Sequence, residues 1–217
     1  MLSLATIYII ILTIVLVVGL IRFRKLSVPF KIVTFSVAVT LLMEIGGELL
    51  AINHKNNSSL SHIESIANYI LYSFTFLYLL KNKTLKKVIL VLILLVTAFF
   101  IINAIFIQPF DQIFPTNVYL VSNVLFVILA LLLFKQMLEH PLNISVIKQS
   151  IFWFNTAILI FSTTMFLNLE LIKYYAEHHW GKDSLYYFWA CSVYTFSILI
   201  GVSLLVDNKK PIRGKHG

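Results

Sequence analysis

The chain has 217 residues, of which 59% are hydrophobic and only 12% are charged. A soluble domain carries about 25% charged residues, so this composition excludes a water-soluble globule and predicts a protein that lies mostly in lipid. The net charge of +8 does not come from a basic stripe with interleaved aromatic residues, so we expect membrane lipids rather than nucleic acid as the partner.

Seven apolar runs approach or reach the length needed to cross a bilayer, about 17 to 25 residues. They cover residues 3–21, 32–52, 63–80, 88–107, 118–134, 150–171 and 185–206. The fifth run is short, and the third is rich in Tyr and Ser. All five prolines lie in the gaps, where they interrupt no helix. The sequence therefore predicts an all-α membrane protein, a single domain formed by a bundle of seven transmembrane helices.

Lys and Arg residues are concentrated in alternate gaps. The first, third and fifth gaps and the C-terminal tail hold 14 of the 17 basic residues, whereas the N-terminus and the other gaps hold only Lys55, Lys173 and Lys182. Because an excess of Lys and Arg marks the cytoplasmic side, we expect the N-terminus outside and the C-terminus in the cytoplasm. This orientation needs an odd number of spans, which agrees with seven, and predicts a multi-pass protein of the plasma membrane, in bacteria the inner membrane.

Two carboxyl groups stand out because ionisable residues inside a membrane span are costly. Glu44 and Glu48 lie one helical turn apart on one face of the second run, with Gly46 and Gly47 between them. Two carboxylates this close repel each other, so we expect at least one to be protonated at neutral pH, or both to share a cation. The glycines would allow a neighbouring helix or a ligand to approach the backbone.

Other polar residues are predicted to lie in the same outer half of the bundle. Glu64, Asn68 and Tyr72 form a stripe at four-residue spacing in the third run. Later runs add Asn103, Asn123, Asn168, Tyr187 and Tyr194. Together with Glu44 and Glu48, these residues predict a ligand-binding polar cavity that opens outward. The alternative for each Asn is a hydrogen bond between helices, and for each Tyr a place in the interfacial aromatic belt.

Histidine and cysteine residues give weaker signals. His54, His62, His178 and His179 lie in the outer gaps near several glutamates, and imidazole with carboxylate can bind zinc. However, no H-E-x-x-H or similar spacing is present, so we expect solvated loop histidines, no metal and no cofactor. Cys191, the only cysteine, lies in an apolar run and is expected to be buried.

Two stretches of the chain carry a resemblance to a family. Residues 42–48 (LMEIGGE), followed by Asn56-Asn57 and His62-Ile63-Glu64, resemble an uncharacterised family of small bacterial seven-helix membrane proteins, as do residues 152–160 (FWFNTAILI). The resemblance implies a fold but no activity and no functional residues. Microbial rhodopsins fit poorly because the last run lacks a lysine, and zinc-dependent seven-helix hydrolases fit poorly because the seven runs contain no histidine.

These features favour a non-enzymatic sensing or regulatory protein. It would bind a small ligand, a proton or a lipid in the outer cavity and signal to a membrane or cytoplasmic protein partner. A small transporter or channel, with proton or cation coupling at Glu44 and Glu48, is the first alternative. An intramembrane enzyme acting on lipid, with these carboxyls as acid and base, is the second. Apart from Ser65 and Tyr72, no nucleophile is evident at a fitting depth, and no catalytic residue is assigned.

Overall fold

The computed structural model describes residues 3–177 and 183–208, and it describes side chains for residues 3–171 and 185–208. Within these ranges the chain forms seven long α-helices and no strand. The helices are α1 (Leu4–Arg22), α2 (Val28–Ile52), α3 (Ser58–Leu79), α4 (Lys83–Ile102), α5 (Thr116–Glu139), α6 (Ser150–Glu177) and α7 (Asp183–Val206). A short π-helical segment, η1 (Asn103–Ile107), continues α4, and a 3-10 turn, η2 (Val146–Lys148), precedes α6.

Several helices extend beyond the apolar runs that predicted them. Helix α2 begins at Val28 rather than at residue 32, so Pro29 lies in its first turn and not in a gap. This position is tolerated because the first turn of a helix does not need the N–H that proline lacks. Helix α5 continues past residue 134 to Glu139, which pairs with Lys135 at 3.7 Å. Hydrophobicity marks the edge of the lipid, whereas the backbone continues as a helix into the headgroup region.

The composition of the helices fits a multi-pass membrane protein. Among the described residues, six helices are long and apolar enough to cross a membrane: α1, α2, α4 with η1, α5, α6 and α7. Large apolar side chains are exposed on the surface of the bundle, such as Phe106 at 78% and Leu138 at 81% exposure. Helix α3 is not among the six because Ser, Asn, Tyr and Glu occupy many of its positions.

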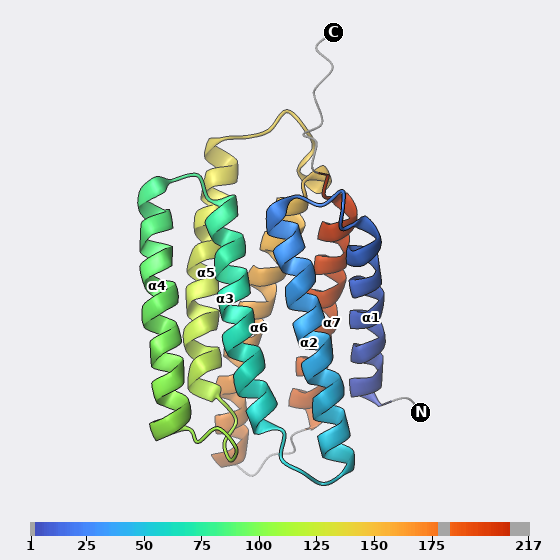
Figure 1. The fold of residues 1–217 in the computed structure, drawn as a ribbon, viewed down its shortest axis with the longest axis vertical. Helices are drawn as coiled ribbons and strands as arrows, with labels where there is room; N and C mark the ends of the chain where they lie inside the picture. Colours follow the sequence, from blue (N-terminus) through green and yellow to red (C-terminus); the bar gives the residue numbers. More distant parts are fainter. Residues whose placement is uncertain (1–2, 178–182, 209–217) are drawn as a thin grey trace.

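Six helices form a closed ring, and α4 lies outside it. Around the ring, α1 packs against α2, α2 against α3, α3 against α5, α5 against α6, α6 against α7, and α7 against α1. Helix α4 packs against α3 at the edge of the bundle (Figure 1). The α1–α2, α3–α4 and α5–α6 connections lie together at one end, which we call the basic end (Figure 1). The α2–α3 and α4–α5 connections lie at the opposite end.

Aromatic side chains close the interior of the ring towards the basic end. Phe30 of α2, Phe76 of α3 and Phe154 of α6 are each at most 1% exposed. The ring of Phe154 lies 6.1 Å from that of Phe30 and 5.5 Å from that of Phe76, centroid to centroid. We call these three residues the aromatic plug.

Asp207, directly after α7, connects three helices at the basic end. One carboxylate oxygen accepts a hydrogen bond from the Ser27 backbone nitrogen at 2.7 Å. The other accepts from the hydroxyls of Ser27 at 3.2 Å and Ser150 at 2.9 Å. Because Ser27 precedes α2 and Ser150 begins α6, the carboxylate lies at the positive ends of two helix dipoles. Arg22 of α1 donates to the carbonyl oxygens of Leu204 and Asp207 and so binds the negative end of α7.

Candidate ligand-binding cavity

The ring of helices encloses a cavity of about 350 Å³. Its described lining comes from α1, α2, α3, α5, α6 and α7 and from the connections of the opposite end, whereas α4 contributes none of it. The cavity reaches from Val15, Val37 and Ile200 in the middle of the helices to Asn57 and Phe114 at the opposite end. This volume lies within the range of small-molecule sites, about 300 to 1,000 Å³.

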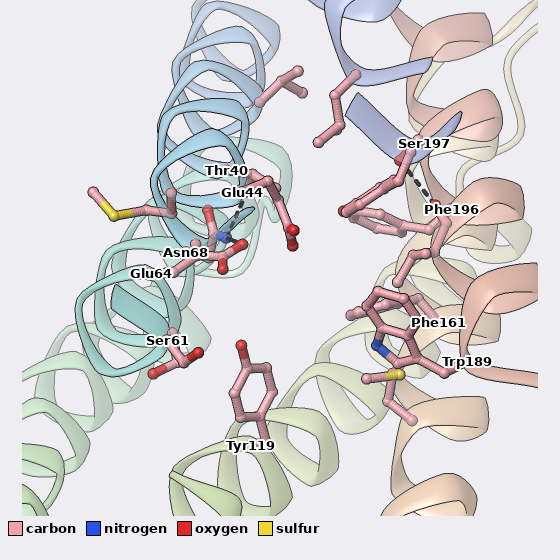
Figure 2. A pocket seen from close by; sticks show the side chains of 18 of the residues that line it. Thr40, Glu44, Ser61, Glu64, Asn68, Tyr119, Phe161, Trp189, Phe196 and Ser197 are labelled. Carbon is pink, nitrogen blue, oxygen red and sulfur yellow. Dashed lines mark hydrogen bonds between the residues drawn. The ribbon is translucent and has the colours of Figure 1, made fainter. Parts of the chain in front are cut away.

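One wall of the cavity, formed by α2 and α3, is polar. The carboxyl groups of Glu44 and Glu64 face the same space, and Asn68 lies beside them (Figure 2). The Asn68 side-chain oxygen accepts from Ser36 Oγ at 2.6 Å, while its nitrogen donates to Thr40 Oγ1 at 2.9 Å and to Glu64 Oε1 at 3.4 Å. Asn68 therefore joins α2 to α3 and fixes the direction of Glu64.

The amino-acid pattern of α3 explains why its polar side chains point inward. Residues four apart lie on one face of a helix, and Glu64, Asn68 and Tyr72 all line the cavity. The exposed positions of α3 are instead apolar or aromatic: Ile63, Phe74 and Tyr78.

The two glycines of α2 lie where α3 approaches closely. A Cβ atom added to Gly46 would lie 3.1 Å from Leu60 Cδ1 of α3, which is tighter than an ordinary contact. Gly47 lies on the cavity lining, near the Asn57 side chain. The structure therefore agrees with the prediction that these glycines permit a close approach of the neighbouring helix.

The facing wall, formed by α6 and α7, is aromatic. Phe161, Trp189 and Phe196 lie across the cavity from the two carboxyl groups (Figure 2). The ring centroids of Phe161 and Phe196 are 4.5 Å apart. The Trp189 ring meets that of Tyr8 edge-on, with 6.2 Å between the centroids. We call Phe161, Trp189 and Phe196 the aromatic wall.

Tyr119 of α5 completes the enclosure between the two walls. Its hydroxyl points towards the carboxyl groups (Figure 2). Its ring stacks on Phe114 at 5.1 Å with an angle of 6°. The α4–α5 connection is thus packed against the cavity at the opposite end.

Two buried polar atoms on the lining have no hydrogen-bond partner in the described part of the chain. They are the side-chain nitrogen of Asn123 on α5 and the hydroxyl of Ser162 on α6. Asn123 is 3% exposed and Ser162 is 0% exposed. A buried polar atom without a partner is costly, and in a native structure each such atom needs an explanation. Among the described residues, unpartnered atoms also occur off the lining, such as Asn155 Oδ1 and Asn168 Oδ1, so a polar ligand in the cavity would account only for those that line it.

The structure brings together six of the ten residues that the sequence predicted for the site. Those on the lining are Glu44, Glu48, Glu64, Asn68, Tyr72 and Asn123. Asn103, Asn168, Tyr187 and Tyr194 do not line the cavity.

Two of these four residues, Asn103 and Tyr194, bond other helices instead. The Asn103 side chain donates to Gln108 Oε1 and accepts from Asn117 Nδ2, both at 3.0 Å, and so joins the π-helical end of α4 to the start of α5. Tyr194 donates its hydroxyl to the Leu4 carbonyl at 2.7 Å and joins α7 to α1. Tyr187 is 61% exposed, and Asn168 is buried in α6 away from the cavity. Cys191 is also exposed, so the prediction of a buried cysteine is wrong.

The prediction for the histidines is wrong at His62. This residue lies in the second turn of α3 and is fully buried. Its Nε2 is 3.1 Å from the Ile113 carbonyl oxygen, and its ring lies 5.5 Å from that of Phe110. His54 is exposed in the α2–α3 connection, as expected, whereas His178 and His179 lie outside the described residues. The described residues contain no cluster of three His, Cys, Asp or Glu side chains that could hold a metal.

The aromatic wall was not predicted from the sequence. Phe161, Trp189 and Phe196 are ordinary residues of apolar helices, and no ionisable neighbour in the sequence marks them. The signal that was available lies in α7: Tyr186, Trp189, Val193 and Ser197 recur with helical spacing on the face next to that of Tyr187, Cys191 and Tyr194.

No protein-family model, curated protein or solved structure matches this chain.

Proposed function

We propose that this chain is a seven-span membrane protein that binds a small molecule in the cavity and acts as a sensing or regulatory module. The observation that carries the proposal is the cavity itself, which has carboxyl groups on one wall and aromatic rings on the other. Buried polar atoms without partners on its lining, at Asn123 and Ser162, also favour a bound molecule. Binding would be passed to a membrane or cytoplasmic protein partner by movement of the ring helices.

In this proposal α3 crosses the membrane although its composition is not apolar. Its polar residues face the cavity, and its exposed residues Ile63, Phe74 and Tyr78 are compatible with lipid. It runs beside α2 and α4 from one end of the bundle to the other (Figure 1). The free energy of placing a helix in the bilayer depends mainly on the residues that face lipid. A helix with this arrangement can therefore span the bilayer.

The proposed orientation places the basic end in the cytoplasm, because Lys and Arg accumulate on that side. Most of the basic residues of the described chain lie in the first, third and fifth connections or in the helix ends that flank them, and these connections lie together (Figure 1). The cavity then extends towards the outer side, with the N-terminus outside.

A transporter or channel is the second candidate, and the aromatic plug counts against it. Phe30, Phe76 and Phe154 fill the ring between the cavity and the basic end, with at most 1% of each side chain exposed. A continuous path across the membrane would need these rings to separate. The cavity as it stands is therefore better suited to binding than to passage.

The proposal is tested with a variant whose cavity is filled. The substitution Ser162→Phe adds a ring to a fully buried position on the lining, whereas Thr163→Phe, the matched control, adds the same ring to the exposed neighbour. We expect compounds from a library of small cations, anions and neutral molecules to raise the Tm of the wild-type protein and of Thr163→Phe, but not of Ser162→Phe. If no compound stabilises the wild type more than Ser162→Phe, the cavity is not a binding site. If proteoliposomes that contain the protein transport a compound that binds it, the protein is a transporter rather than a sensor.

A further inference from the structure

Acidic side chains on the described lining of the cavity have no basic partner there. Three glutamates, Glu44, Glu48 and Glu64, line it, and none of its described lining residues is Lys, Arg or His. The ion pair found among the described residues, Lys135 with Glu139, lies on the surface near the end of α5 and does not involve them. A carboxyl group that is withdrawn from water either takes up a proton or is stabilised as a carboxylate by a cation or hydrogen bonds, and a cationic ligand favours the second state.

Internal hydrogen bonds compensate only part of this cost. Asn68 donates to Glu64 Oε1 at 3.4 Å, which is a long bond, and the Thr40 hydroxyl is the other hydrogen-bond partner of this carboxyl group. The carboxyl groups of Glu44 and Glu64 face open cavity space rather than a neighbouring helix (Figure 2). A positively charged group in that space would therefore gain from both.

The aromatic wall fits the rest of such a ligand. The faces of aromatic rings carry negative charge and attract cations, and ammonium groups are commonly recognised in this way. Phe161 and Phe196 lie across the cavity from the carboxyl groups, and Trp189 extends the same wall (Figure 2). A ligand with an ammonium group and an apolar body would place the charge near the glutamates and the body against these rings.

A second observation, independent of the acidic residues, also points to a ligand. Asn123 and Ser162 are more than nine-tenths buried and line the cavity, yet the Asn123 amide nitrogen and the Ser162 hydroxyl have no partner among the described residues. The amide nitrogen is a hydrogen-bond donor.

We propose that the cavity binds an organic ammonium compound with an apolar body, held between Glu44 and Glu64 on one side and Phe161, Trp189 and Phe196 on the other. This inference rests on the proposed binding function and specifies its ligand class. The ammonium group comes either from a free amine or from the headgroup of an aminophospholipid.

The experiment compares two probes of the same shape and different charge. Benzyltrimethylammonium and its neutral carbon isostere, 2,2-dimethylpropylbenzene, are titrated into the full chain in phosphatidylglycerol nanodiscs, with calorimetry and Trp fluorescence as readouts. We expect the cation to bind the wild type at least about tenfold more tightly than the isostere, because the charge adds both ionic and cation–π attraction. This comparison uses the unaltered protein and so does not depend on the folding of any variant.

Variants then assign the charge preference to the cavity. Glu44→Gln and Glu64→Gln should each weaken the binding of the cation by about tenfold and leave binding of the isostere unchanged. Glu139→Gln, which alters an exposed glutamate, should change neither affinity. Replacing half of the phosphatidylglycerol with phosphatidylethanolamine also lowers the negative charge of the bilayer, so replacement by the same amount of a neutral glycolipid is the control. Apparent binding of the probe falls further with phosphatidylethanolamine than with the glycolipid if the natural source is a lipid headgroup, and falls equally with both if the source is a free amine.

Failure of this inference can be told apart from failure of the proposed function. Equal binding of both probes, or cation binding that neither Glu→Gln variant alters, overturns the ammonium class. In that case neutral compounds that stabilise the wild type but not Ser162→Phe would still support a binding function. If no compound at all distinguishes the wild type from Ser162→Phe, both proposals fall.

Discussion

The side-chain nitrogen of Asn68 on α3 donates a hydrogen bond to Thr40 Oγ1 on α2 at 2.9 Å. The same amide accepts from Ser36 Oγ at 2.6 Å and contacts Glu64. One side chain thus satisfies two hydroxyl groups of the neighbouring helix and orients an acidic residue of the cavity. The polar wall is a hydrogen-bonded unit rather than a set of separate groups.

Substitution of Asn68 should therefore reduce stability. Asn68→Leu keeps a similar volume but removes every bond that the amide makes, so we expect the free energy of unfolding to fall by about 1 to 2 kcal/mol. The measurement is reversible unfolding in mixed micelles. Asn53→Ala is the matched control, because its amide bonds only the Leu49 carbonyl of its own helix at an exposed helix end. A stability of Asn68→Leu equal to that of Asn53→Ala would contradict the role given to this amide.

The polar stripe of α3 was predictable from the sequence, and the aromatic wall was not. Glu44, Glu48 and Glu64 are identified by the cost of placing carboxyl groups in lipid, and the four-residue spacing of Glu64, Asn68 and Tyr72 gives their common face. The position of the wall depends on α7 packing against α1 and closing the ring. No local pattern encodes that long-range contact.

The prediction that Tyr187 and Tyr194 of α7 line the cavity failed for the same reason, because the packing of α7 against α1 decides which of its faces points inward. Tyr187 and Tyr194 attract attention because they are polar, but a tyrosine hydroxyl needs only one partner, and Tyr194 finds it in the Leu4 carbonyl of α1. The described residues form the seven helices that were predicted, and six of these helices are long and apolar enough to cross a membrane, because long apolar runs are a strong signal. The ends of the helices were less predictable, since polar residues such as Lys135 and Glu139 continue α5 beyond the apolar run.

Asp207 should be important for the stability of the basic end. Asp207→Ala removes the acceptor for the Ser27 backbone nitrogen and for the Ser27 and Ser150 hydroxyls. We expect a loss of about 2 to 3 kcal/mol, because hydrogen bonds to a charged acceptor are stronger than neutral ones. Unfolding of this variant is compared with that of Asp111→Ala, which alters an exposed aspartate at the opposite end. Equal stabilities would show that the carboxylate does not hold α2 and α6 in place.

His62 should hold the α4–α5 connection against α3. Its ring contacts Phe110 and the Ile113 carbonyl, so His62→Ala removes both contacts. We expect hydrogen–deuterium exchange in residues 108–115 to become about tenfold faster, because local opening there becomes easier. His54→Asn is a suitable control, since His54 has φ 55° and asparagine tolerates that conformation. Unchanged exchange in His62→Ala would show that the connection is held by other contacts, such as those of Asn56 with Asp111 and Gln112.

The membrane crossing of α3 can be tested with two positions that flank it. In a Cys191→Ala background, Lys55→Cys and Lys81→Cys each introduce one cysteine at an exposed site, before and after α3 respectively. Because Lys and Arg accumulate on the cytoplasmic side, we expect a membrane-impermeant maleimide to label Lys55→Cys in intact cells and Lys81→Cys only after permeabilisation. Labelling of both cysteines in intact cells, or of neither, would mean that α3 does not cross the bilayer. Labelling of Lys81→Cys alone would preserve the crossing and reverse the orientation, so that the cavity would extend towards the cytoplasm and its ligand would be an intracellular compound.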